Sequence, residues 1–230
     1  MTSLTPAQVE FVESVLRLKP RIATFDCDGT LWSGDAGEGF FSWELDRKLF
    51  SDEIQHWARP RYADYLAGKV PEEVMCGEMA TMHRGRREEV VLQSAATYFE
   101  QEILPNIFLE LQELVRRLRE AGCDVWAVSS TNVWVIRVAM RYFGIPQDRI
   151  LAAETVVENG VITDRLLRVP SGDGKPEAIR AALSGRPDCA FGNSIWDREM
   201  LEMSRHPFAI NPNPNLKEIA VAKEWRVYQP

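Results

Sequence analysis

Residues 22–32 read IATFDCDGTLW, and this stretch decides the fold. It opens with four mostly apolar residues, which is typical of a short strand buried in a parallel sheet. The strand is expected to end at Asp26, and Asp28, Gly29 and Thr30 follow at once. Two acids on a tight turn are suited to phosphoryl transfer, because one carboxylate can attack phosphorus while the other moves a proton. The same spacing also occurs in turns whose acids only face water.

Working outward toward the C-terminus, helical and strand patterns alternate from residue 105 onward. Asn159-Gly160 between β-branched residues predicts a hairpin over 156–161. Strands that alternate with helices indicate an α/β fold: a Rossmann-like, doubly wound parallel sheet with helices on both faces. The expected strands are 124–128, 150–153, 189–191, 208–210 and 225–228, and the expected helices are 107–121, 133–143, 216–222, one after Pro176 and one from about Ile195.

The segment between residues 33 and 104 differs, because it is rich in helix formers and holds no convincing strand. We therefore expect a core made of 1–32 and 105–230, with a helical domain, 33–104, inserted after the first strand. Before that strand, Thr5 and Pro6 predict the start of a helix whose apolar face holds Val9, Val12, Val15 and Leu16. The helices expected in the insertion are 38–49, 52–67, 71–82 and 87–102.

Three more polar clusters are expected at strand ends, where parallel sheets bind their ligands. The first is Ser129-Ser130-Thr131-Asn132, which offers hydroxyls and amides to an anion but also fits plain helix capping. The second is Lys175 in a loop, GDGKP, that lacks the spacing of a nucleotide-binding P-loop. The third, GNSIWD at 192–197, places Asn193 and Asp197 four residues apart, which suits a hard cation or a capped helix.

Composition narrows the functional class. The 230 residues carry a net charge of −7, which gives no general affinity for nucleic acid or anionic membranes. No apolar run is long enough to span a bilayer, and the first 20 residues do not resemble a signal peptide. The four cysteines lack disulfide or metal spacing, so a reducing cytoplasm is the expected compartment.

Taken together and in this order, the motifs DCDGT, Ser129, Lys175 and GNSIWD resemble those of the haloacid dehalogenase-like hydrolases. Within that superfamily the chain is most similar to the phosphoserine-phosphatase branch, whose cap domain occupies the place of segment 33–104. The resemblance implies a Mg²⁺-dependent phosphatase acting on a small phosphorylated metabolite. It makes Asp26 the nucleophile that becomes phosphorylated, Asp28 the proton donor and acceptor, and Lys175 the balancing charge.

The resemblance also implies the remaining site residues. The metal would be held by Asp26, the main chain of Asp28, Asn193 and Asp197, directly or through water. The substrate would be bound by Thr30, Asp35, Ser129 and Ser130. The chain departs from the branch at Asn193, where an acid is usual, at Ser130, where glycine is usual, and at Trp196, where asparagine is common. An amide oxygen binds Mg²⁺ less strongly than a carboxylate, so metal affinity is expected to fall.

Substrate selection is expected to lie in the cap domain. Asp35 or Glu38 could meet an ammonium group, and Arg59 or Arg61 could meet a carboxylate, although all four also fit a solvated helix surface. The cap region is also rich in aromatic residues, which could form a cage for a quaternary ammonium or could simply pack in the core. They are Trp32, Phe40, Phe41, Trp43, Trp57 and Tyr62. Phosphoserine or a related phosphorylated amine is the expected substrate class.

Other residues and functions rank lower. His56, His83 and His206 have neither metal-ligand spacing nor neighbouring acids that would favour a functional role. Residues 84–87 (RGRR) are expected to form a solvated turn. A phosphotransferase could use the same phospho-aspartate, and a phosphate-binding protein could use the same fold. Retention of both Asp26 and Asp28 argues against pure binding, because binding needs neither a nucleophile nor an acid.

Overall fold

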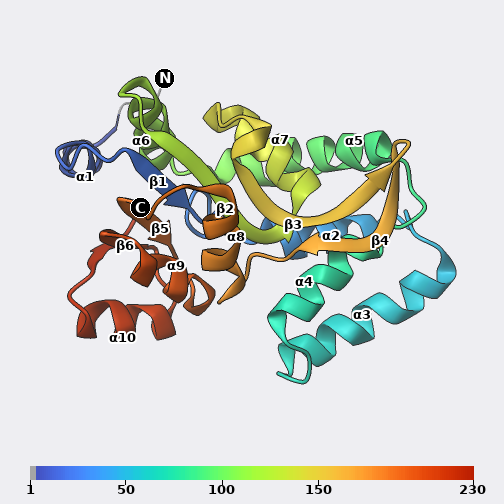
Figure 1. Cartoon of the computed structure of the whole chain (residues 1–230). Coiled ribbons are helices and arrows are strands. Elements are labelled where there is room, and N and C mark those ends of the chain that lie inside the picture. The colour runs from blue at the N-terminus through green and yellow to red at the C-terminus, as the bar shows by residue number, and fades with distance from the viewer. Residues whose placement is uncertain (1–3) are drawn as a thin grey trace.

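The computed structural model describes residues 4–230, so the first three residues of the predicted core segment lie outside the described part. A seven-stranded sheet runs through it in the order β4-β3-β2-β1-β5-β6-β7 (Figure 1). All neighbouring strands are parallel except β3 and β4, which are antiparallel. The strands are β1 (Ile22–Phe25), β2 (Asp124–Asn132), β3 (Ile150–Glu158), β4 (Val161–Arg168), β5 (Cys189–Gly192), β6 (His206–Ile210) and β7 (Arg226–Tyr228). The predicted α/β fold is confirmed.

Helices cover both faces of this sheet. On one face lie α1 (Pro6–Leu16), α6 (Leu109–Glu120) and α7 (Val133–Phe143), and on the other lie α8 (Gly174–Ala182), α9 (Arg198–Met203) and α10 (Pro214–Ala222) (Figure 1). Each face has its own buried apolar cluster. Helix α1 starts as predicted, with the Thr5 side chain capping it, but Val9 of its expected apolar face is 43% exposed.

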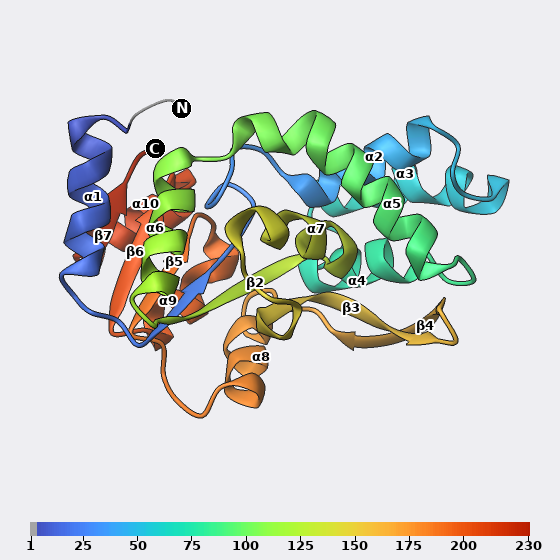
Figure 2. The same cartoon turned by 90° about the horizontal axis from the view of Figure 1, so that it is seen from above.

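Four helices lie between β1 and β2, as the sequence predicts: α2 (Ala36–Asp46), α3 (Asp52–Leu66), α4 (Glu72–Thr81) and α5 (Glu88–Tyr98). Helix α2 begins two residues earlier than expected because Asp35 caps it, accepting a hydrogen bond from the Glu38 amide. Helix α5 ends earlier than expected and continues as one π-helical turn, Phe99–Ile103. Figure 2 shows these helices gathered over one end of the sheet, away from α1 and α10.

The hairpin predicted around Asn159-Gly160 is confirmed, and it joins β3 to β4. Both turn residues have positive φ, 51° and 77°, which is the conformation that an Asn-Gly hairpin turn requires.

Two predicted strand ends were wrong. Strand β2 continues past Val128 to Asn132 with an irregular register, and β3 continues past Ala153 to pair with β4. Residues 129–132 therefore form the irregular end of β2 instead of a loop behind it.

The expectation that His83 lacks an acidic neighbour was also wrong. Its Nε2 atom lies 2.7 Å from Oε2 of Glu44, which is fully buried in α2. Arg86 donates to the other oxygen of Glu44 at 2.7 Å, so the turn at 84–87 is only partly solvated. A charge buried in this way must be paired, and the pairing of Glu44 links α2 to the turn before α5.

Within residues 4–230, no helix has the length and apolar character needed to cross a membrane.

Candidate active site

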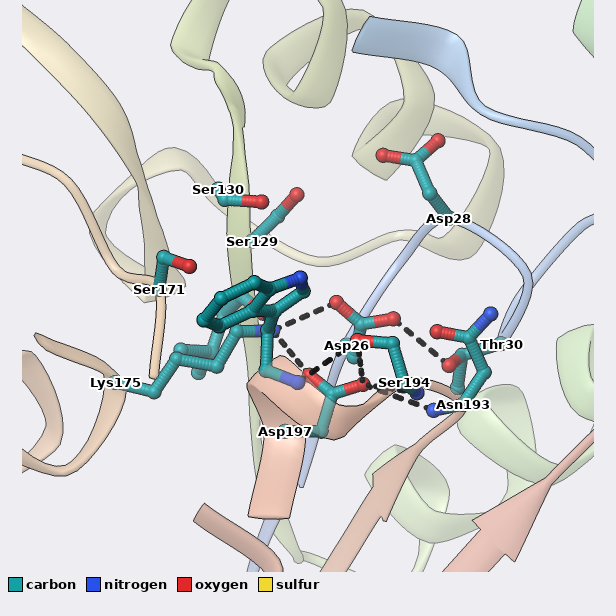
Figure 3. A network of polar contacts seen from close by, with 12 residues as sticks. Asp26, Asp28, Thr30, Ser129, Ser130, Ser171, Lys175, Asn193, Ser194 and Asp197 are labelled. Atoms are coloured by element: carbon teal, nitrogen blue, oxygen red, sulfur yellow. Dashed lines mark hydrogen bonds and ion pairs between the residues drawn. The ribbon is translucent and has the colours of Figure 1, made fainter. Parts of the chain in front are cut away.

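The four sequence clusters meet at one edge of the sheet. Strands β1, β2 and β5 are adjacent and parallel, so their carboxyl ends bring Asp26, the segment 129–132 and the segment 192–197 together. Lys175, at the start of α8, extends its side chain to the same place (Figure 3).

Asp26 lies at the centre of this cluster and is 6% exposed. One carboxylate oxygen accepts a hydrogen bond from Thr30 Oγ1 at 2.8 Å, and the other accepts from Lys175 Nζ at 2.7 Å (Figure 3). Burial and the nearby Asp197 carboxylate raise the pKa of Asp26 to about 6, against the opposing effect of Lys175. The side chain is therefore ionised at neutral pH and held in one orientation.

Lys175 is 1% exposed, and its ammonium group is shared between two acids. Besides Asp26, it donates to Asp197 Oδ1 at 2.5 Å and to the Val128 carbonyl at 3.0 Å. Burial lowers the pKa of Lys175, but Asp197 and Asp26 together raise it above its ordinary value. The lysine thus carries a permanent positive charge directly beside Asp26.

Asp197 is fully engaged by the protein. Its second oxygen, Oδ2, accepts from the backbone amides of Asn193 and Ser194, each at 2.9 Å. With Lys175 on Oδ1, both carboxylate oxygens already have partners. Asp197 therefore fixes both Lys175 and the 193–194 backbone.

Asn193 lies against the turn that carries the two acids. A Cβ atom on Gly29 would come within 1.8 Å of Asn193 Nδ2, so a side chain there would displace Asn193, and the φ of +72° at Gly29 also favours glycine. The side-chain amide of Asn193 makes no hydrogen bond within residues 4–230 and lines the adjoining pocket. Its oxygen is free to meet a ligand beside Asp26.

Asp28 faces away from Asp26, toward the helical insertion (Figure 3). Its carboxylate accepts from the Ala36 amide at 2.6 Å, Trp32 Nε1 at 2.8 Å and Thr131 Oγ1 at 2.7 Å. Burial and the Asp35 carboxylate raise the pKa of Asp28 to about 7, although the hydrogen bonds from Thr131 and Ala36 lower it. The group can therefore exist as an acid or as a base near neutral pH.

The predicted anion-binding segment is only partly in the pocket. Ser129 is 1% exposed, and its hydroxyl accepts from the Thr131 amide at 3.1 Å. Ser130, Thr131 and Asn132 line the pocket instead. Thr30, also predicted to bind substrate, is buried and donates to Asp26. In this structure Thr30 and Ser129 support other site groups, and Ser130 and Asp35 face the pocket.

The pocket has a volume of about 240 Å³ and lies between the sheet edge and helices α2, α3 and α4. Its floor holds Asp26, Asp28 and Lys175. The insertion contributes acids and aromatic rings to the pocket, and of these only Asp35, Glu38 and Tyr62 were considered from the sequence. The pocket-lining residues from outside the predicted site include Tyr65, Glu72, Met75, Cys76 and Met79.

The two arginines considered for a substrate carboxylate do not line this pocket. Arg59 pairs with Asp46 on the surface, and Arg61 makes a bidentate pair with Glu78 at 2.7 Å. Among the six aromatic residues considered for a cage, Tyr62 lines the pocket. Trp32, Phe40 and Phe41 are buried in the core, which confirms ordinary packing for those three.

A comparison with protein-family models matches residues 23–202 to the haloacid dehalogenase-like hydrolases. The chain belongs to this family. The match covers β1 with its two acids, the helical insertion, and the segments that carry Lys175 and Asp197. The resemblance to this superfamily inferred from the sequence motifs is therefore confirmed. Several of its relatives are named as phosphatases.

Several proteins resemble this family member along much of its length. A probable phosphatase of Mycobacterium tuberculosis is 32% identical over 130 residues, or 54% of this chain and 45% of the relative. A phosphoserine phosphatase of the same organism is 25% identical over 89% of this chain and 69% of its own. A histidinol-phosphatase of Neisseria meningitidis is 25% identical over 90% of this chain and 97% of its own. The chain thus spans about half the length of the first of these relatives.

A solved structure of a Bordetella pertussis protein of unknown function has the same fold. It superposes with a TM-score of 0.80 at 24% sequence identity, covering 90% of this chain and 97% of its own. The likeness includes the helical insertion, since it extends over nearly the whole of both chains.

Proposed function

We propose that this member of the haloacid dehalogenase-like hydrolases is a Mg²⁺-dependent phosphatase of phosphate monoesters that works through an acyl phosphate on Asp26. The observation that carries the proposal is the geometry at Asp26, whose carboxylate lines the pocket and is oriented by Thr30 and Lys175. A buried carboxylate with a fixed orientation and a neighbouring cation is suited to nucleophilic attack on a dianion. The substrate is a small phosphorylated metabolite, with phosphoserine or a related phosphorylated amine as the expected class.

The reaction has two balanced steps. In the first, an Asp26 oxygen bonds to phosphorus, the ester oxygen leaves, and protonated Asp28 gives it a proton. In the second, water attacks the phospho-aspartate, Asp28 takes the proton of that water, and Asp26 is released with inorganic phosphate. A pKa of about 7 allows Asp28 to act in both directions. Because Asp28 is bonded to Thr131 and Ala36 and faces away from Asp26, its carboxylate must leave these donors to reach the leaving group.

The donor set fits Mg²⁺, a hard cation that takes oxygen ligands and keeps several waters. Within residues 4–230 no three His, Cys, Asp or Glu side chains form a metal cluster, so an all-carboxylate site is absent from this part of the chain. The oxygens of Asp26, the Asp28 main chain and Asn193 would hold the cation instead, with Asp197 behind them. A bound Mg²⁺ would offset the repulsion between Asp26 and a phosphate dianion.

We further propose that segment 33–104 acts as a cap domain on a core formed by 1–32 and 105–230. Helices α2, α3 and α4 of this segment supply one side of the pocket, so their movement would admit substrate and then exclude water. The protein is expected to work in the cytoplasm, and all four cysteines are free, as a reducing compartment requires.

The test is phosphate release from a panel of phosphate monoesters, measured for the unmodified chain and for Asp26→Asn, with and without Mg²⁺. We expect release that needs Mg²⁺ and falls at least a thousandfold in the variant. Transfer of phosphate to an added alcohol, faster than to water, would identify a phosphotransferase instead. Binding of esters without any release would contradict the proposal and indicate a phosphate-binding protein.

A further inference from the structure

The walls of the pocket carry a charge pattern that the reaction itself does not need. Beyond Asp26 and Asp28, three more carboxylates line it: Asp35, Glu38 and Glu72, all from the helical insertion. The one cation among the lining residues is Lys175, and it is already shared between Asp26 and Asp197. With the phosphate of a substrate at Asp26, as proposed, these acids line the space left for the rest of the molecule.

Glu72 is the most deeply placed of these acids. It is 8% exposed and stands in the first turn of α4, facing the core across the pocket. Its carboxylate accepts from Ser171 Oγ at 2.9 Å and, over longer distances of 3.4 Å, from Ser130 Oγ and Tyr65 OH. No cation of residues 4–230 forms an ion pair with it. An ionised acid buried without a counter-charge costs stability, and a positive ligand in the pocket would supply that counter-charge.

Aromatic rings stand beside the acids. Tyr62 and Tyr65 of α3 both line the pocket, with ring centroids 5.5 Å apart. Tyrosine faces attract ammonium and imidazolium groups, and the attraction grows when water is excluded. The pocket therefore presents carboxylates and tyrosine side chains to the same part of the substrate.

A substrate carboxylate, in contrast, would find no arginine and no lysine other than Lys175 among the pocket-lining residues of 4–230. Arg61 is held by both oxygens of Glu78, Arg59 is exposed beside Asp46, and neither lines the pocket. A carboxylate placed among Asp35, Glu38 and Glu72 would be repelled by like charges and would have no free cation as a partner among these lining residues.

We propose that the leaving group of the substrate is a cation without a carboxylate, an O-phosphorylated amino alcohol bound through its amine or imidazole by Glu72 and Asp35 beside Tyr62 and Tyr65. The proposal rests on the proposed function and refines the expected substrate class. Phosphoserine, which carries a carboxylate as well as an ammonium group, becomes a poor substrate. Glu72 is its main specificity-determining residue.

The test uses matched esters. Aminoalkyl phosphates of two, three and four carbons are compared with alkyl phosphates in which a methyl group replaces the ammonium, and the two-carbon amine is compared with phosphoserine. We expect kcat/KM for the best amine to exceed that for its neutral counterpart, and that for phosphoserine, at least tenfold. In Glu72→Gln the amine-to-neutral ratio falls at least tenfold. Glu73→Gln changes an exposed acid of the same helix and keeps the ratio.

Two results would overturn the inference while leaving the phosphatase proposal intact: hydrolysis of phosphoserine as fast as that of the amines, or an amine-to-neutral ratio that Glu72→Gln does not change. If no ester is hydrolysed, the proposed reaction fails, and binding to Asp26→Asn tests the inference separately. Tighter binding of aminoalkyl than of alkyl phosphates, lost on adding Glu72→Gln, then supports it. Equal dissociation constants contradict it.

Discussion

The ammonium nitrogen of Lys175 lies 2.7 Å from a carboxylate oxygen of Asp26, and both side chains are almost completely buried. The same nitrogen contacts Asp197, so one positive charge serves two acids in a region from which water is largely excluded. Such a group has two roles at once. It orients the proposed nucleophile, and it stabilises the folded chain by neutralising acids that could not otherwise remain ionised.

Replacing Lys175 with methionine tests the structural role. The variant leaves Asp26 and Asp197 as unpaired buried acids, and breaking a buried pair in this way costs about 3–5 kcal/mol. We expect a loss of this size in the free energy of unfolding by urea at pH 7, together with loss of phosphate release. Lys217→Met, at an exposed position on α10, is the control. A Lys175 variant as stable as the control would show that the acids are protonated or solvated instead.

The contact between Gly29 and Asn193 leads to a second prediction. Alanine at Gly29 places Cβ 1.8 Å from Asn193 Nδ2 and also imposes positive φ on a residue with a side chain. Gly68→Ala is a matched control, because Gly68 has a φ of +73° and no atom within 4 Å of the added Cβ. Both variants should lose about 1–2 kcal/mol of stability through backbone strain.

Only Gly29→Ala should also raise the Mg²⁺ concentration needed for half-maximal phosphate release, by at least fivefold, because it displaces Asn193. An equal Mg²⁺ requirement in the two variants would remove Asn193 from the proposed metal site.

The residues gathered at the carboxyl ends of the strands could be predicted from the sequence for a physical reason. Short apolar strands that alternate with helices specify a parallel sheet, and a parallel sheet gathers whatever follows its strands. Asp26, Lys175, Asn193 and Asp197 were therefore recognisable as one site, although nearly 150 residues separate the first from the second. The hairpin at Asn159 was equally local, since turn geometry alone specifies it.

Residues whose role depends on packing between distant helices could not be found in this way. Glu72 follows a proline at a helix start, where acids are common, and nothing local shows that it faces Ser171. The pairing of His83 with Glu44 joins residues 39 apart in the chain, so no spacing rule signals it. The irregular end of β2 likewise arises from pairing with β3, which the apolar run up to Val128 did not reveal.

Asn193 stands where the phosphoserine-phosphatase branch usually has an acid, and its substitution by aspartate tests what this difference does to metal binding. A carboxylate binds Mg²⁺ more strongly than an amide, so we expect the half-saturating Mg²⁺ concentration to fall at least tenfold, read from calorimetric titration or from phosphate release. Asn213→Asp changes the cap of α10, where aspartate serves equally well, and should leave Mg²⁺ binding unchanged. A metal affinity that does not change in Asn193→Asp would place the cation elsewhere.

The burial of Glu72 predicts a pH-dependent stability. Burial, which Ser171 only partly offsets, raises the pKa of Glu72 from 4.5 to about 7. Between these values the folded chain binds the proton and the unfolded chain does not, so this group's contribution to stability falls as pH rises. A shift of this size corresponds to a change of about 3 kcal/mol in the free energy of unfolding. This stability is fully present below pH 4.5 and is lost once the pH rises above about 7.

Glu72→Gln removes this titration while keeping the shape of the side chain. We therefore expect the variant to be more stable than the unmodified chain at pH 8, by up to about 3 kcal/mol, with the gap closing toward pH 4.5. Urea unfolding across this range measures the gap, and Glu73→Gln should show none, because its side chain is exposed. A gap that is constant with pH would mean that Glu72 stays ionised or stays neutral throughout. A gap that grows with pH shows an acid kept at a cost in stability, as expected for a group whose purpose is to bind a cation.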